Sequence, residues 1–350
     1  MKSAKPFVLP LQGVECNRTQ RESSLSSSIE LINMERKNTG DLLILNATMV
    51  LPDQTVLGDL RVEHGTITKI AINGGIEPKE NERVIDASGL YLLPGIIDPQ
   101  VHFREPGQPE KEDLGSGSAA AVSGGVTSFL DMPNNKPAIV DMEGMQMKLD
   151  SAAATCVSNY GFFIGATPHN LEQLQEVVGT PSAPKAIPGI CGTKIFMGSS
   201  TGTLLVNEHE ALDTIFSGIG GLIAVHAEDE ARLNERYPSF KDRTDMAAHA
   251  EWRDDVTALL ATKLAVGLAE KHNHRLHVLH LTSGLEADWL EGRTTLPSQA
   301  NGQTIITTEV LPQHLTFNEH DVEREGVRLK MNPPIRYQED IDILWRRIHD

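Results

Sequence analysis

The chain has 350 residues, which suits one large barrel-type domain or two smaller domains. Its 48 acidic and 31 basic residues give a formal net charge of -17, which argues against nucleic acid and anionic membranes as partners. Three cysteines without a close pair, Cys16, Cys156 and Cys191, exclude a disulfide framework and a thiolate zinc site and favour a reducing compartment.

Residues 1–40 are polar and rich in serine, with no sustained periodicity. This composition predicts disorder, or a mis-annotated extension, because ordered patterning starts only after Met34, at Asp41. Acidic residues within the segment disfavour a transit peptide, so we expect a cytoplasmic protein, with a plastid as the alternative. No apolar run reaches about 18 residues, and no membrane-spanning helix is predicted.

Short apolar runs between turn signals occupy residues 41–94 and predict a small β-sandwich portion with antiparallel pairing. The dipeptides Pro52-Asp53 and His64-Gly65 supply turns between the runs. The expected strands are 42–45, 48–50, 59–63 and 66–71.

From residue 95 to residue 350, β-rich runs alternate with helical patterns, which predicts a parallel α/β sheet. Helices are expected at 258–271, where leucines recur at helical spacing, and at 338–349. A closed barrel and a doubly wound open sheet both fit, although no Gly-rich phosphate fingerprint follows the first strand. The expected strands are 95–103, 126–132, 157–165, 190–197, 221–226, 275–281 and 304–309.

The first of these strands ends in polar residues at alternating positions, Asp98, Gln100, His102 and Arg104. Successive side chains of a strand point to opposite faces, so these four would share one face. Parallel α/β folds place their functional groups at the carboxyl ends of strands. The run therefore predicts the floor of an active site, with ordinary sheet alternation as the alternative.

Three more ligand-type residues lie in apolar runs: Lys194 in the fourth strand, His226 at the end of the fifth and His280 at the end of the sixth. Because barrel strand ends converge, we expect them to meet His102 at one point. A lysine among Ile, Phe and Met would lose its proton or need a carboxylate partner. An unprotonated amine can capture carbon dioxide as a carbamate that bridges two metal ions, and a buried salt bridge is the alternative.

With these residues in place, the sequence resembles the amidohydrolase superfamily and, within it, the dihydroorotases, over residues 41–350. The resemblance implies a (β/α)8-type barrel, incomplete at its C-terminus, that follows the small β-sandwich portion. It also implies one or two zinc ions, bridged by a carboxylated Lys194 if there are two. The matching segments are Asp98–His102, Lys194, His226, His280, Phe103–Gly107, Met132–Asn135 and Asn332–Arg336.

The activity that the resemblance implies is the interconversion of dihydroorotate and N-carbamoyl-aspartate in pyrimidine synthesis. Arg104 and Asn134 would grip the substrate carboxylate, and Asn332 would sit over the ring. A guanidinium fork suits a carboxylate, and hydantoinase- and allantoinase-type relatives do not typically have arginine at that place. The expected partners are this small substrate and a second copy in a homodimer, without nucleic acid or membrane.

Two departures from the family pattern affect the expected chemistry. Gln100 stands where the motif has its first histidine, and an amide oxygen is a weak zinc ligand. The family's general-base aspartate is expected on an eighth strand beyond Asp350, so no catalytic residue is assigned and a truncated chain or a fragment of a longer enzyme is expected. The alternatives are a catalytically impaired homologue with a binding or structural role, a hydantoinase- or allantoinase-type enzyme, and a chain without metal.

The remaining histidines carry no assigned role. His314 lies in a segment that the family keeps near the pocket and is expected to be a bystander. The others are expected in turns or on polar helix faces, solvated: His64, His169, His209, His249, His272, His274, His277, His320 and His349.

Overall fold

The computed structural model describes residues 40–198, 204–295 and 302–349. The chain divides into two compact units. The first comprises Met1–Ile96 with Ser123–Gly125, and the second Ile97–Val122 with Val126–Asp350. The predictions for residues 1–39 lie outside the described residues.

The first unit is a five-stranded sheet in the order β3-β2-β1-β4, with β5 also paired to β1. Its strands are β1 (Leu42–Val50), β2 (Thr55–Glu63), β3 (Thr66–Ile72), β4 (Arg83–Asp86) and β5 (Tyr91–Leu92). The two runs predicted at 42–45 and 48–50 are a single strand that is irregular near Asn46, where φ is 58°. Asn tolerates this left-handed conformation better than most residues.

The antiparallel prediction is correct for β1, β2 and β3 but wrong for β4 and β5, which both run parallel to β1. The cause is the connection after β3, which leads the chain to the opposite side of β1. That connection is held by an ion pair of Arg61 Nε with Glu82 Oε1 at 2.6 Å and by the backbone N–H of Ile76, which donates to Asp59. The apolar core of this unit centres on Ala47, Met49 and Ala87.

The second unit contains a sheet of seven strands, and the recorded pairings within it are parallel. All seven strands predicted from the sequence are present and neighbour one another in chain order. A doubly wound sheet would reverse its strand order partway, so the topology is that of a barrel wall. The strands are β6 (Ile96–Val101), β7 (Val126–Asp131), β8 (Asn159–Gly165), β11 (Ile190–Phe196), β12 (Leu222–His226), β13 (Arg275–Val278) and β14 (Ile306–Thr308).

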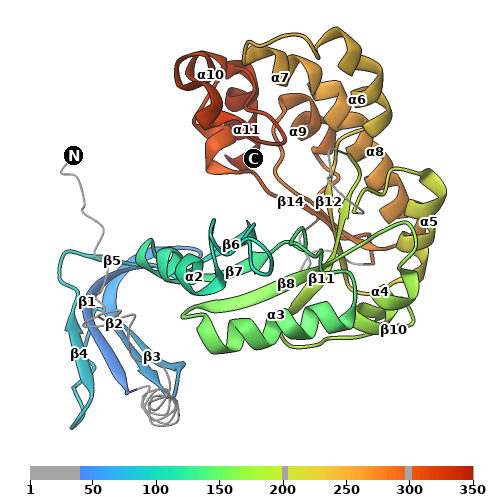
Figure 1. Ribbon diagram of the computed structural model, residues 1–350. Coiled ribbons are helices and arrows are strands. Elements are labelled where there is room, and N and C mark those ends of the chain that lie inside the picture. Colours follow the sequence, from blue (N-terminus) through green and yellow to red (C-terminus); the bar gives the residue numbers. More distant parts are fainter. Residues whose placement is uncertain (1–39, 199–203, 296–301, 350) are drawn as a thin grey trace. The chain divides into compact units, whose positions relative to one another are not determined.

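Helices join these strands, and α3, α4 and α8 pack against β8, β11 and β13 respectively (Figure 1). The predicted helices at 258–271 and 338–349 correspond to α8 and α11. The α-helices are α2 (Leu114–Ser123), α3 (Met142–Thr155), α4 (Leu171–Val178), α5 (His209–Gly218), α6 (Glu230–Arg236), α7 (Ala247–Trp252), α8 (Asp255–His272), α9 (Gly284–Leu290), α10 (Glu319–Glu325) and α11 (Gln338–His349). Shorter elements are the hairpin β9 (Gly179–Thr180) with β10 (Ala183–Pro184) and the 3-10 turns Tyr237–Ser239, Pro312–Leu315 and Gly326–Leu329.

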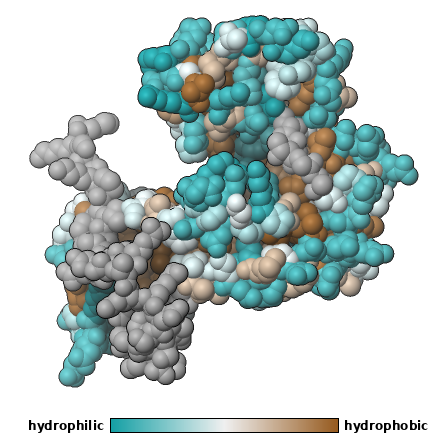
Figure 2. Space-filling view, viewed as in Figure 1, coloured by the Kyte–Doolittle hydropathy of each residue, from teal (hydrophilic) through white to brown (hydrophobic). Residues whose placement is uncertain are grey.

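Fully buried side chains such as Phe129, Phe162, Ile195 and Ile223 form the core between this sheet and its helices. The surface over α6, α7 and α10 is mainly hydrophilic (Figure 2). Within the described ranges, no helix combines the length and the apolar character that crossing a membrane requires.

Helix α9 buries the carboxyl group of Glu286, which accepts hydrogen bonds from Thr262 Oγ1 at 2.7 Å and from Ser283 Oγ at 3.2 Å. Burial raises the pKa of Glu286 to about 7, although Thr262 and the charge of Arg336 act in the opposite direction. The folded protein therefore binds this proton more tightly than the unfolded chain, whose pKa is near 4.5. The contribution of Glu286 to the free energy of unfolding should be greatest below that value and fall as the pH rises to about 7.

We expect Glu286→Gln to lack this fall. At about pH 8 its free energy of unfolding should exceed that of the wild type by about 3 kcal/mol, and this gain should shrink as the pH falls from about 7 to about 4.5. Urea unfolding of both proteins across this range measures the difference. A gain that stays the same at every pH would contradict the buried, proton-binding carboxyl.

Candidate functional site

Lys194 lies in β11 with its side chain wholly buried, and burial lowers its pKa well below the usual 10.5. Its register partners in the neighbouring strands, Gly165 and Ala224, are small, which leaves room for the long side chain. The amine lies 4.7 Å from the centre of the Phe196 ring and has no hydrogen-bond partner among the described residues. Lys194 is therefore an unpartnered amine inside the barrel wall, and its burial disfavours the protonated form.

His226 is the last residue of β12, His280 lies two residues after the end of β13, and the two side chains face each other. His226 Nδ1 lies 3.0 Å from His280 Nε2, and the ring centres are 4.7 Å apart. The backbone of His280 has a φ of 39°, a costly conformation for a residue with a side chain. Hydrogen bonds hold it there: the N–H groups of His280 and Leu281 donate to the side chain and the carbonyl oxygen of Glu309. The structure thus brings these two predicted residues into direct contact.

A buried ion pair lies directly behind His226. Glu228 Oε2 accepts a hydrogen bond from His226 Nε2 at 2.6 Å and is also paired with Arg253 Nη2. Burial would raise the pKa of Glu228, but His226 and Arg253 together lower it to about 2. Sequence reasoning missed both residues. The available signal was a carboxylate two positions after a strand-ending histidine.

His102 follows β6, and its Nδ1 lies 2.7 Å from Asn134 Oδ1. Since an amide oxygen only accepts, His102 Nδ1 carries the proton and Nε2 keeps a lone pair. Burial lowers the pKa of His102 to about 4, and the charges of Lys194, Arg104 and His226 act on it as well. His102 is therefore a neutral ring, electrostatically coupled to the other predicted residues.

A second buried network, which sequence reasoning also missed, holds the segment that carries Arg104. Asp131, at the end of β7, pairs with Lys148 Nζ at 2.7 Å and accepts from the backbone N–H of Phe103 at 3.0 Å. Lys148 also donates to Asn135 Oδ1 at 2.8 Å, and Asn135 Nδ2 donates to the carbonyl oxygen of Phe103 at 3.1 Å. Burial raises the pKa of Asp131 to about 6 despite the positive charge of Lys148.

Gln100 and Asp98 lie on β6, half-buried. Gln100 Oε1 is buried without a hydrogen-bond partner in the described part of the chain, and its backbone N–H donates to Asp98 Oδ1 at 3.1 Å. Burial raises the pKa of Asp98, and the negative charge of Glu309 adds to the effect. Gln100 thus offers a neutral oxygen whose hydrogen-bonding capacity is unused.

Asn332 does not lie with this cluster. Its side chain is exposed, and within the described residues no hydrogen bond or ion pair links Asn332 to His102, His226 or His280. His314, expected as a bystander, is buried, and its Nε2 lies 3.3 Å from the carbonyl oxygen of Pro333.

The prediction of solvated histidines is wrong for four residues that form hydrogen bonds in partly or fully buried places. One is His272, whose Nε2 lies 2.8 Å from Asp213 Oδ1. His274 Nε2 bonds the carbonyl oxygen of Ile219, His249 Nε2 that of Met331, and His277 contacts Thr307 and Glu309. In each case the hydrogen-bond partner lies at least 30 residues away in the sequence, so local sequence does not reveal it.

The chemical groups of His102, His226, His280 and a carboxylated Lys194 are of kinds that bind divalent metals. Among the described residues no group of three or more His, Cys, Asp or Glu side chains is placed to hold a metal ion. Lysine is not one of those four residue types, and Lys194 contributes an unpartnered amine that adds to burial in lowering the pKa of both facing histidines, His226 and His280. Conversion of this amine to a carbamate would add two oxygen ligands, and imidazole with carboxylate-type oxygen suits zinc.

A model of the amidohydrolase family matches residues 91–293, and the chain belongs to this family.

The chain is 32% identical over 315 residues to a dihydroorotase of Methanosarcina mazei, covering 89% of this chain and 66% of that protein. It is 31% identical over 321 residues to an allantoinase of Deinococcus radiodurans, covering 88% and 66%. A solved L-hydantoinase (dihydropyrimidinase) from Arthrobacter aurescens matches with a TM-score of 0.77 and 26% identity, covering 89% and 67%. The chain thus spans about two thirds of the length of these relatives, as the 66% coverage states.

Proposed function

We propose that this chain belongs to a zinc-dependent hydrolase of cyclic amides that interconverts dihydroorotate and N-carbamoyl-aspartate in pyrimidine synthesis. The observation that carries the choice of substrate is Arg104. It lies two residues after His102, and its positive charge adds to burial in lowering the pKa of the His102 ring. The dihydroorotase and allantoinase relatives are almost equally similar, at 32% and 31% identity, so overall similarity does not decide between them.

Each group in the proposed mechanism has a distinct task. His102, Lys194, His226 and His280 would hold zinc, with Gln100 as a weak additional donor and a carboxylated Lys194 as the bridge if two ions bind. A bound zinc ion supplies Lewis-acid activation of water and of an amide carbonyl at neutral pH.

Two residues of this chain would orient the substrate. The Arg104 guanidinium would bind the carboxylate through paired hydrogen bonds. Asn134 uses its oxygen on His102, so its Nδ2 group is the part that can donate to the same carboxylate. Asn332 stays a proposed ring contact that would require the loop before α11 to approach the site.

A catalytically impaired homologue is the second candidate, favoured by Gln100 at a ligand position. Such a protein would bind zinc or the substrate without turning it over. An allantoinase or hydantoinase activity is the third, favoured by the allantoinase and hydantoinase relatives.

The test is hydrolysis of dihydroorotate, allantoin and hydantoin by the zinc-loaded chain, with the variants Arg104→Gln and Arg243→Gln alongside. We expect dihydroorotate to be preferred, and Arg104→Gln to lower kcat/KM for it by about 10- to 100-fold, the value of a charged hydrogen-bonded contact. Arg243, in an exposed ion pair with Asp245, is the matched control and should leave activity unchanged. Zinc-loaded protein that leaves dihydroorotate intact while hydrolysing allantoin would refute the choice of substrate.

A further inference from the structure

Glu228 is fully buried, two residues beyond His226 and past the end of β12. Its hydrogen bond to His226 Nε2, at 2.6 Å, has a defined direction. An ionised carboxylate has only acceptor atoms, so the proton belongs to Nε2 of the ring. A neutral His226 then has a bare lone pair on Nδ1.

That lone pair faces His280. His226 Nδ1 lies 3.0 Å from His280 Nε2, so in the metal-free protein the single proton between them must come from His280. His280 Nδ1 is buried and has no hydrogen-bond partner within the described residues, so it can take up the proton when Nε2 gives it away. A divalent cation that replaced the shared proton would find two imidazole nitrogens already facing each other.

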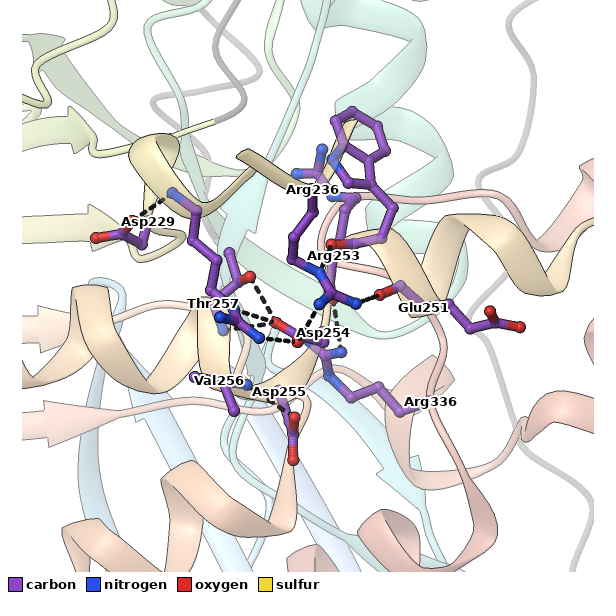
Figure 3. Close-up of polar contacts among 11 residues, drawn as sticks. Asp229, Arg236, Glu251, Arg253, Asp254, Asp255, Val256, Thr257 and Arg336 are labelled. Atoms are coloured by element: carbon purple, nitrogen blue, oxygen red, sulfur yellow. Dashed lines mark hydrogen bonds and ion pairs between the residues drawn. The ribbon is translucent and has the colours of Figure 1, made fainter. Parts of the chain in front are cut away.

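Arg253 holds the carboxylate in place. Its guanidinium pairs with Glu228 Oε2 and is almost completely buried, with 3% of its surface exposed. The Arg253 backbone is fixed as well, because its carbonyl oxygen accepts from Arg336 Nη1 at 2.8 Å. In Figure 3 the side chain of the next residue, Asp254, contacts Arg236 and Thr257. Arg232 also donates to Asp254.

We propose that Glu228, oriented by Arg253, is a positioning residue that keeps His226 protonated on Nε2 and so presents His226 Nδ1 and His280 Nε2 as a preformed pair of zinc ligands. The inference rests on the zinc site of the proposed function and is independent of which cyclic amide is hydrolysed. Hydrogen-bond partners of this kind fix the tautomer and orientation of metal-binding histidines.

Zinc affinity gives the first readout, measured on metal-free protein by competition with a chromophoric chelator. We expect Glu228→Gln to raise the Kd for zinc by about 10- to 100-fold, because an amide can donate as well as accept and no longer selects one tautomer. Glu286→Gln is the matched control: the same change at a similarly buried glutamate, 3% exposed, that contacts hydroxyl groups instead of an imidazole. It should leave the Kd within about twofold of the wild type.

The second readout is the histidine side-chain 15N spectrum of the metal-free protein, with the His226 signals assigned by their loss in His226→Asn. We expect a protonated Nε2 and a bare Nδ1 for His226 in the wild type and a mixture of both tautomers in Glu228→Gln. Glu228→Asp, which keeps the carboxylate, should restore part of the zinc affinity and of the single tautomer. If Glu228→Gln does not fold, Arg253→Lys replaces it, with a smaller loss expected in both readouts.

A wild-type His226 protonated on Nδ1 would overturn the inference, and so would a Glu228→Gln protein that binds zinc as tightly as the wild type. A wild-type chain without measurable zinc affinity would overturn it as well. Protein that binds zinc in a Glu228-dependent way but does not hydrolyse dihydroorotate would remove the proposed substrate and keep the positioning role.

Discussion

Lys194→Met should abolish zinc binding and activity and, at the same time, make the metal-free protein more stable. The lysine amine is wholly buried and has no hydrogen-bond partner among the described residues, so the fold carries the cost of desolvating it. Methionine fills a similar volume without a polar group. We expect a gain in the free energy of unfolding of about 1–3 kcal/mol, the usual cost of a buried polar group without a partner.

The sign of the pH dependence follows from the lowered pKa of Lys194. Below its usual value of 10.5 the unfolded chain binds a proton that the folded chain does not, so folding is penalised there and the penalty disappears as the pH approaches 10.5. The advantage of Lys194→Met should therefore narrow at alkaline pH.

Urea unfolding of metal-free protein and elemental analysis of zinc-loaded protein measure the two effects. Lys271→Met is the control: this lysine is exposed and pairs with Asp213 at the surface, so the variant should keep its zinc and its stability. A Lys194→Met protein that is less stable than the wild type, or that retains stoichiometric zinc, would show that the lysine is an ordinary structural residue.

Lys148→Met should lower the free energy of unfolding by about 3–5 kcal/mol, because it leaves the carboxylate of Asp131 buried without its counter-charge. Asn135 would also lose the donor to its side-chain oxygen. The backbone of Phe103 is anchored by Asp131 and Asn135, so we expect the neighbouring Arg104 to lose its fixed position and KM for dihydroorotate to rise.

Removing both members of the pair distinguishes loss of the pair from loss of packing. Asp131→Leu combined with Lys148→Met should recover much of the stability, since replacing a buried ion pair by apolar groups is often nearly neutral. KM should stay high in the double variant, because the acceptor for the Phe103 N–H is then gone. Urea unfolding and steady-state kinetics report the two quantities. A loss below about 1 kcal/mol in Lys148→Met would contradict the buried pair.

Local sequence patterns predicted the strands of the second unit better than the strand directions in the first unit. All seven strands of the barrel wall were expected, since each is a short apolar run between helices. The orientation of β4 and β5 was not, because it depends on where the connection anchored by Arg61 and Glu82 returns the chain, and such long-range contacts leave no periodic signal.

Local sequence patterns were enough to predict where a functional site lies: one apolar strand contains Lys194, and others end in His102, His226 and His280. Strand ends of a parallel sheet meet at one edge, so a one-dimensional pattern was enough to predict their meeting. The residues behind these side chains became apparent only from the three-dimensional structure. Glu228 and Arg253 are 25 residues apart in the sequence, and Phe103 and Asp131 are 28 residues apart. A buried charge is stable only when a partner of opposite charge contacts it, and the fold determines which distant residue that partner is.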